Sequence, residues 1–370
     1  MQKVAIFTIF RDLYNYGQIL QAYALTTYLN NAGCDARLVD YRYDIDRCFF
    51  AYETNRNFKN LLKVVAKRTF IYPLYLKLND KKRFLQFKKA HLKITTKAYN
   101  TVYELQKCPP VADCCVSGSD QIWSIYLPRP KVYFLAYACK NSKKVAYASS
   151  FGRSSLSQCE QKEYAPLLSM YSAIGVREDS GVDICAKMGC KAEWVPDPTI
   201  LLSKSDYEKI MHAKSPFKTN KKKVFVYIVG GDNDAKLAAA IKGMHDAEVI
   251  IAADNIINGL QNSNLSIPEW IRAINDCDLV LTNSFHGTMF SLIFNKDFYV
   301  FERVGETRSM NVRVNSILSV VDLKNRLITE SAQNLQLNEP PINWDSVLAK
   351  LKAWKDVGEN FIRKNILKNA

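Results

Sequence analysis

Residues 279–290 read LVLTNSFHGTMF, a short apolar run followed by polar residues and then by apolar ones again. The run Leu279–Leu281 predicts a buried strand, and the apolar residues Phe290–Phe294 predict a helix after it. Polar side chains between a strand end and a helix lie at the carboxyl edge of a parallel sheet, where ligands bind in open α/β folds. The stretch therefore predicts a parallel-sheet domain with a ligand site around His286, where Gly287 would let a ligand or another backbone approach closely.

The same alternation of strand and helix extends outward in both directions. The chain opens with a strand–helix–strand pattern at residues 3–10, 18–31 and 37–41, which predicts a parallel sheet. Further strands are expected at residues 111–116, 144–148, 173–176 and 193–195, and at residues 224–229, 248–252 and 298–301. A hydrophilic segment, residues 204–223, separates the two groups of strands, and residues 344–368 have the pattern of an amphipathic helix.

This order predicts an α/β protein with two Rossmann-like parallel-sheet domains in a GT-B-like arrangement. We expect an N-terminal domain at residues 1–203, a C-terminal domain with the His286 motif at residues 204–343, and a C-terminal helix at residues 344–370 that packs back. No P-loop, G-x-G-x-x-G or G-x-S-x-G motif is found, which argues against nucleotide cofactors and serine hydrolases.

The positive charge of the chain is concentrated in one segment. Of the formal net charge of +15, the segment from Arg56 to Lys97 contributes +12, with Asp80 as its only acid. Aromatic residues interleave with the charges, and we expect a basic helical insertion broken near Pro73. Three interpretations remain: a solvated helix packed on the domain, a helix on an anionic membrane surface, or a nucleic-acid contact, which no recognition module accompanies.

The ten cysteines lack the spacing of a zinc site, and no apolar run is long enough to span a membrane. No signal peptide is recognisable in residues 1–10, so we expect reduced thiols in a cytoplasmic protein without a metal.

Six short motifs carry a family resemblance: NYGQILQAYAL (15–25), GSDQIW (118–123), YASSFG (147–152), VRE (176–178), VPDPT (195–199) and NSFHGT (283–288). Together and in this order they resemble the polysaccharide pyruvyl transferase family over most of the chain. The resemblance implies a GT-B-like fold and transfer of the enolpyruvyl unit of phosphoenolpyruvate to a sugar, which gives a cyclic pyruvate ketal. It implies no metal or nucleotide cofactor.

One position departs from the family pattern. In characterised relatives an arginine that contacts the donor stands two residues before the motif histidine, and here that residue is Ser284. Arg308 and Arg313, in a segment where the family tends to place an arginine, could supply the missing cation. A solvated loop is the alternative for either residue.

The chemistry assigns expected roles to the remaining motif residues. His286 suits the general acid, because histidine can carry a proton near neutral pH. Arg177 is the expected donor-anion contact, or else it pairs with a carboxylate at a helix cap. Asp120 and Glu178 are candidate bases, and Asp197 is expected to fix an interdomain turn. Further substrate-binding candidates are Asn15, Gly17, Gln18, Gln21, Ser119, Gln121, Trp123, Asn283, Ser284 and Gly287.

We therefore expect a bacterial transferase that modifies a hexose of a cell-surface polysaccharide precursor, such as that of a capsule or exopolysaccharide, with phosphoenolpyruvate as donor. The acceptor is expected to be lipid-linked, and the enzyme to be cytoplasmic, either free or bound peripherally at the inner face of the cell membrane. A GT-B glycosyltransferase that uses a nucleotide sugar and a non-catalytic family member are the alternatives.

Overall fold

The fold is described from a computed structural model of the whole chain. The described residues are 1–10, 15–42, 80–124, 127, 130–138, 141–230, 234–253, 263–304, 309–329 and 337–368.

The N-terminal domain is built on a seven-stranded parallel sheet with the strand order β3-β2-β1-β4-β5-β6-β7. Its strands are β1 (Lys3–Phe7), β2 (Asp35–Tyr41), β3 (Ile94–Tyr99), β4 (Cys114–Ser117), β5 (Lys143–Ser149), β6 (Ala173–Val176) and β7 (Glu193–Trp194). The chain proceeds from β1 toward one edge of the sheet, returns to β4, and then proceeds toward the other edge. Such a reversal opens a crevice beyond the carboxyl ends of β1 and β4.

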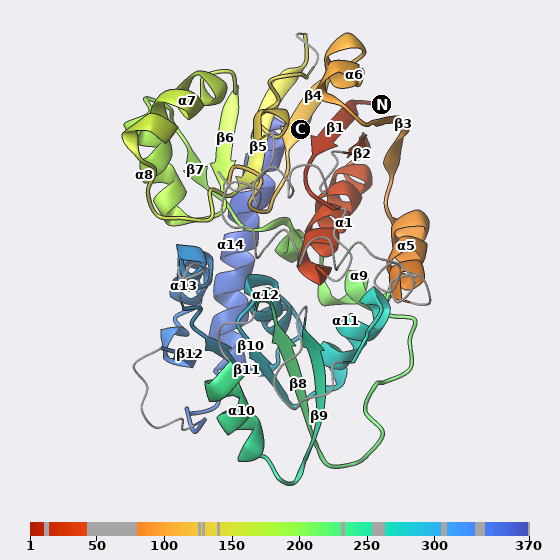
Figure 1. Cartoon of the computed structure of the whole chain (residues 1–370), viewed down its shortest axis with the longest axis vertical. Coiled ribbons are helices and arrows are strands. Elements are labelled where there is room, and N and C mark those ends of the chain that lie inside the picture. Colours follow the sequence, from red (N-terminus) through yellow and green to blue (C-terminus); the bar gives the residue numbers. More distant parts are fainter. Residues whose placement is uncertain are drawn as a thin grey trace, which may run out of the picture.

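The C-terminal domain repeats this plan with five parallel strands in the order β12-β11-β10-β8-β9. They are β8 (Lys222–Ile228), β9 (Ala247–Ala253), β10 (Leu279–Thr282), β11 (Asp297–Phe301) and β12 (Leu327–Ile328). The reversal here falls between β8 and β10, so the predicted strand Leu279–Leu281 lies beside the crevice. The expected fold class, two Rossmann-like parallel-sheet domains, is confirmed (Figure 1).

Helices connect the strands in both domains. The N-terminal domain contains α1 (Tyr16–Asn31), α5 (Asp80–His91), α6 (Val102–Lys107), α7 (Gln158–Leu168) and α8 (Asp179–Lys187), followed by the short helices η2 (Pro198–Leu201) and α9 (Lys204–Glu208). The C-terminal domain contains α10 (Asp234–Lys242), α11 (Ile267–Asp276), α12 (Phe285–Ile293) and α13 (Asn311–Val320), and α14 (Trp344–Asn365) closes the chain.

Three expectations about local structure were wrong. Helix α12 begins at Phe285 rather than Phe290, because the Ser284 side chain caps it by accepting a hydrogen bond from the Gly287 N–H. Arg313 lies in helix α13 rather than in a solvated loop. The strand at residues 298–301, which we expected to be the last of the chain, is followed by β12, a short parallel strand beside β11.

The basic insertion is described only in its last part, since residues 56–79 lie outside the described residues. Residues 94–97 belong to edge strand β3 and are not helical as expected, because they pair with β2. In α5 the rings of Phe84 and Phe87 are buried, 5.2 Å from Tyr16 and 6.1 Å from Tyr23 respectively. This aromatic face therefore packs on the protein, as the first of the three interpretations expects.

Helix α14 returns from the C-terminal domain and runs along the N-terminal domain (Figure 1). Trp354 packs on Trp194 at 4.6 Å, and Phe361 lies 6.0 Å from Tyr147. The amide of Gln2 donates to the Ile366 carbonyl at 2.7 Å, so the two ends of the described chain meet. The helix thus packs back on the N-terminal domain, and the expected boundary at residue 203 falls between β7 and β8.

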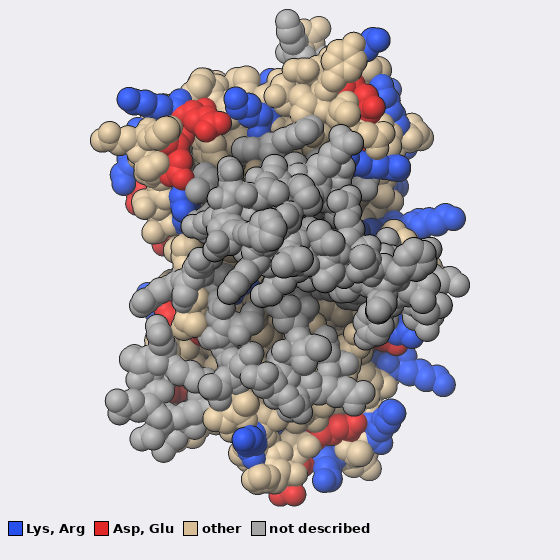
Figure 2. Space-filling model, viewed as in Figure 1, with Lys and Arg blue, Asp and Glu red and all other residues tan. Residues whose placement is uncertain are grey.

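The face seen in Figure 2 carries described Lys and Arg side chains mainly around its rim, with Asp and Glu side chains among them. Among the described residues, no helix combines the length and the apolar character needed to cross a membrane.

Candidate functional site

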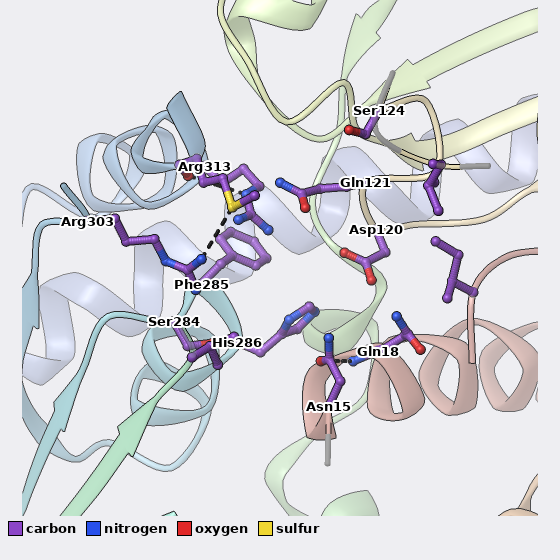
Figure 3. Close-up of a pocket in the computed structure, with 14 residues that line it drawn as sticks. Asn15, Gln18, Asp120, Gln121, Ser124, Ser284, Phe285, His286, Arg303 and Arg313 are labelled. Carbon is purple, nitrogen blue, oxygen red and sulfur yellow. Dashed lines mark hydrogen bonds between the residues drawn. The ribbon is translucent and has the colours of Figure 1, made fainter. Parts of the chain in front are cut away.

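A cleft of about 320 Å³ opens where the two strand-order reversals face each other. Its walls contain residues that follow β1, β4, β8 and β10, together with the start of α1 and part of α13. Figure 3 shows Arg303, Arg313, Phe285 and His286 on the C-terminal side, opposite Asp120, Gln121 and Gln18. The lining residues are Ile9, Asn15, Gln18, Asp120, Gln121, Ser124, Leu127, Val229, Ser284, Phe285, His286, Arg303, Met310 and Arg313.

His286 lies in the first turn of α12, where the Ser284 cap and the Thr282 hydroxyl fix the backbone. Its side chain is buried against the cleft, and its Nε2 atom lies 3.7 Å from Oδ2 of Asp197. This distance is too long for a hydrogen bond, and the pair becomes an ion pair when His286 is protonated. The expected strand-end histidine is therefore at the junction of the two domains, beside a carboxylate of the other domain.

Asp197 is fully buried at the start of η2 and accepts hydrogen bonds on both oxygens. Oδ2 accepts from the Ser119 hydroxyl at 2.8 Å and from Arg177 at 3.1 Å, and Oδ1 accepts from the Thr199 N–H and hydroxyl at 3.0 and 2.7 Å. Burial alone would raise the pKa of Asp197, but His286, Arg177 and the Thr199 backbone outweigh it and hold the pKa well below its ordinary value. Asp197 is thus a permanent negative charge beside His286, a role beyond the expected interdomain turn.

Arg177 was the expected donor contact, but its guanidinium is directed into the protein. Its side chain is only 1% exposed and lies within 3.6 Å of three carboxylates, those of Asp120, Glu178 and Asp197. Burial lowers the pKa of Arg177, and these carboxylates more than compensate, so the pKa lies above its ordinary value. Its planar face packs on Phe285, with the guanidinium carbon 4.6 Å from the ring centre.

Glu178, the second candidate base, is buried away from the cleft lining and accepts a hydrogen bond from the Ser150 hydroxyl. Burial raises the pKa of Glu178, and Arg177 and Ser150 only partly offset that rise. The alternative interpretation of Arg177 as a partner of neighbouring carboxylates accounts for its contact with Glu178.

Asp120 lines the cleft opposite His286 in a backbone conformation that few residues adopt. Its φ of +80° lies in the left-handed region, and its carbonyl accepts hydrogen bonds from the Ile122 and Ser150 N–H groups at 2.7 and 3.1 Å. Its carboxylate lies 3.6 Å from an Arg177 nitrogen. Strain of this kind persists where surrounding contacts enforce it, and it is frequent at functional sites.

Arg303 and Arg313 supply the cations of the cleft. Arg303 follows β11, and its Nε donates to the Asn283 carbonyl at 3.1 Å, which places the guanidinium beside Ser284. Burial lowers the pKa of Arg313 to about 9, with further repulsion from Arg177 and Arg303. Arg308 lies outside the described residues. Our sequence analysis missed Arg303, although it follows a strand as the other site residues do.

The other predicted site residues divide into two groups. Asn15, Gln18, Gln121 and Ser284 line the cleft. The second group supports the fold around it and comprises Gly17, Gln21, Ser119, Trp123, Asn283 and Gly287.

Each member of the second group has a structural contact instead of a place in the cleft lining. Gln21 donates to Thr8, Ile9 and Gln18, and Asn283 exchanges two hydrogen bonds with the Val229 backbone. Trp123 is fully buried and stacks on Phe134 at 4.9 Å. Gly287 packs on the Thr282 side chain. We had expected a ligand or another backbone segment at this place. In the described part of the chain, no group of three or more His, Cys, Asp or Glu residues is arranged to hold a metal ion.

Comparison with solved structures gives distant likenesses. MnaA of S. aureus, in its structure with UDP, is 11% identical with a TM-score of 0.50, and the match covers 100% of this chain and 92% of that one. The UDP-GlcNAc 2-epimerase of Methanocaldococcus jannaschii is 10% identical with a TM-score of 0.49, covering 98% and 99%. The Streptomyces sp. SF2575 glycosyltransferase SsfS6, complexed with thymidine diphosphate, is 10% identical with a TM-score of 0.43, covering 98% and 100%. The likeness to MnaA supports the two-domain fold and nothing finer.

Comparison of the sequence gives the family. No curated protein matches it. The family model described as polysaccharide pyruvyl transferase matches residues 15–303, a span that begins at the Asn15 cap of α1 and ends at Arg303 in the cleft. The chain therefore belongs to the polysaccharide pyruvyl transferase family, whose members are transferases of polysaccharide modification.

Proposed function

We propose that this protein transfers the pyruvyl group of phosphoenolpyruvate to a hexose of a bacterial cell-surface polysaccharide precursor and forms a cyclic ketal. The observation that carries the proposal is the charge of the cleft. Arg313 and Arg303 both line it, and among the described residues no carboxylate oxygen lies within 4.0 Å of the Arg313 guanidinium. A buried cation with no carboxylate in contact favours an anionic ligand.

Phosphoenolpyruvate carries two anionic groups, which suits two guanidinium groups better than one. In the proposed complex the forks of Arg303 and Arg313 bind the phosphate and the carboxylate. Arg303 would then take the part that the family arginine has at the position of Ser284. Negative charge in the cleft is also favoured by the start of α12, because Ser284, Phe285 and His286 at that end of the helix line the cleft.

His286 is the proposed general acid, because it lines the same cleft beside the ionised Asp197. It donates a proton to the methylene carbon of phosphoenolpyruvate, and the adjacent carbon becomes an oxocarbenium-like centre. Asp120, on the opposite wall, is the proposed base for the sugar hydroxyls. Asn15, Gln18 and Gln121 are neutral hydrogen-bonding groups of the kind that bind sugar hydroxyls, so we assign the acceptor to this wall.

The proposed reaction balances without an oxidant or a further reactant. One sugar hydroxyl adds to the electrophilic carbon, and the C–O bond to phosphate breaks. The second hydroxyl then closes the ring. Of the two hydroxyl protons lost, one replaces the proton delivered to the methylene carbon and the other leaves with inorganic phosphate.

The test is incubation with phosphoenolpyruvate and aryl or lipid-linked hexosides. We expect phosphate release together with a product heavier than the acceptor by one pyruvic acid minus water, and unchanged turnover with EDTA. The His286→Ala variant should remain folded and make no product. Nucleotide-sugar binding without an effect of phosphoenolpyruvate would favour a GT-B glycosyltransferase, and the absence of both would favour a non-catalytic family member.

We further propose that the acceptor is lipid-linked and that the enzyme works at the inner face of the cell membrane. The support is the net charge of +12 between Arg56 and Lys97. Near an anionic surface each basic residue contributes about 1 kcal/mol. Binding to anionic vesicles, weak binding to neutral ones and release by salt are expected in co-sedimentation. Equal binding to both vesicle types would contradict this placement.

A further inference from the structure

His286 belongs to the C-terminal domain, but residues of the N-terminal domain enclose its ring. A Cβ atom on Gly17 would lie 2.0 Å from His286 Nδ1 and 2.6 Å from His286 Cβ. Real Cβ atoms essentially never come within 3.0 Å of another non-bonded heavy atom. Because the His286 Cβ is itself too close, rotation of the imidazole could not relieve the overlap. Any side chain at position 17 must therefore displace the histidine or separate the helices α1 and α12.

The other side of the ring faces Asp197. His286 Nε2 is buried and has no hydrogen-bond partner among the described residues, and Asp197 Oδ2 lies 3.7 Å away. The carboxylate cannot turn away easily, because Thr199 holds one oxygen and Ser119 and Arg177 hold the other. A fixed negative charge at this place favours a proton on Nε2.

Helix α1 is itself tied to the C-terminal domain next to Gly17. The ring of Tyr16 stacks on Trp270, with 5.2 Å between centroids, and its hydroxyl donates to the Leu265 carbonyl at 2.7 Å. These contacts hold the start of α1 in place against α12. The closeness of Gly17 to His286 is thus enforced by the domain interface.

We propose that Gly17 and Asp197 are the positioning residues of His286, so that the histidine is oriented only when the two domains are in contact. Gly17 supplies the space for the ring, and Asp197 selects the protonated nitrogen. The inference rests on the role of His286 in the proposed function, but it concerns the orientation of the ring and can be measured without turnover.

The first experiment reads the ring directly. The full-length protein, labelled with ¹⁵N in its four histidines, is examined by long-range ¹H–¹⁵N correlation, and His286→Ala identifies the signals. We expect the proton of His286 on Nε2. Asp197→Asn should shift the population toward Nδ1. The control Asp356→Asn, which removes an exposed carboxylate of α14 far from His286, should not. If Asp197→Asn does not fold, Asp197→Glu replaces it, since a longer carboxylate must also move the ring signals.

The second experiment is a double-variant cycle on the contact with Gly17. Gly17→Ala should lower the melting temperature or prevent folding, and the same change in a His286→Gly background should be tolerated, because the colliding side chain is gone. Gly243→Ala is the control, since a Cβ there meets nothing closer than 3.5 Å. Equal effects of Gly17→Ala in both backgrounds would overturn the role of Gly17. Unchanged His286 signals in folded Asp197 variants would overturn that of Asp197.

Transfer assays separate this inference from the proposed function. If the wild-type protein shows the Nε2 proton and the Gly17 coupling but makes no ketal, the positioning stands and the proposed function fails. If it makes ketal, folded Asp197→Asn should lower kcat about tenfold or more and leave KM for phosphoenolpyruvate within about twofold. Wild-type kcat in that variant would contradict a positioning role in catalysis.

Discussion

Replacement of Arg313 by Met separates the stability of the protein from anion binding. Arg313 is buried in the cleft wall, and its one hydrogen bond among the described residues runs from Nε to the Met310 carbonyl at 3.3 Å. Methionine is of similar length and carries no charge. We expect Arg313→Met to make the ligand-free protein more stable, since the folded protein then no longer holds a cation repelled by Arg177 and Arg303.

The magnitude follows from the pKa of Arg313. Burial and two neighbouring arginines lower it from the ordinary arginine value to about 9. At about 1.4 kcal/mol per pKa unit, the charged form costs the folded state roughly 5 kcal/mol. Because the folded pKa lies below the unfolded one, the full cost applies at pH 7. It disappears only as the pH rises from about 9 toward the ordinary pKa of arginine. Loss of the Met310 hydrogen bond and water in the cleft reduce the expected gain to about 2 kcal/mol.

The assay is thermal unfolding with and without inorganic phosphate or phosphoenolpyruvate. The ligand-free variant should melt a few degrees above the wild type, and added anion should raise the melting temperature of the wild type only. Arg363→Gln, on the exposed face of α14, is the control for removal of a positive charge far from the cleft. A lower melting temperature of ligand-free Arg313→Met, or an unchanged response to anion, would refute the reasoning.

Three further substitutions address the remaining site residues. Arg303→Lys keeps the charge but loses the planar fork, and we expect kcat/KM for phosphoenolpyruvate to fall about tenfold or more, equivalent to about 1.4 kcal/mol, with the acceptor KM unchanged. Asp120→Asn removes the proposed base and should lower kcat by about 10²-fold or more, while phosphoenolpyruvate still raises the melting temperature of the variant. Full activity of the variant would show that Asp120 is not the base. Arg177→Lys should lower the free energy of unfolding by about 2–4 kcal/mol, because Asp197 and Glu178 lose the guanidinium that they share. An unchanged melting temperature together with a raised KM for phosphoenolpyruvate would instead indicate that Arg177 contacts the donor directly.

Much of the fold could be predicted because its signals are local. Apolar runs of three to eight residues that end in polar turns marked the strands, and β6 (Ala173–Val176) has the predicted bounds. The same rule brought Asp120, Ser284 and His286 to strand ends. Helices α7 and α13 were missed because their local patterns are weak. Helix α7 contains Pro166, and α13 carries the charged Arg313 on its buried face. The start of α12 was misplaced because the Ser284 cap, and not hydrophobicity, determines it.

The sequence by itself determined the type of each domain, the family and the residues that lie at the carboxyl edges of the sheets, since period and turn chemistry act over a few neighbouring residues. Only the tertiary structure decided which edges meet. It placed Gly17 and Asp197 on either side of His286, turned Arg177 toward three carboxylates, and left Arg303 and Arg313 in the cleft. The two contacts of His286 join residues about 90 and 270 positions apart, and those of Arg177 depend on burial between neighbouring loops. No local pattern encodes the order of strands or the packing of one domain on the other.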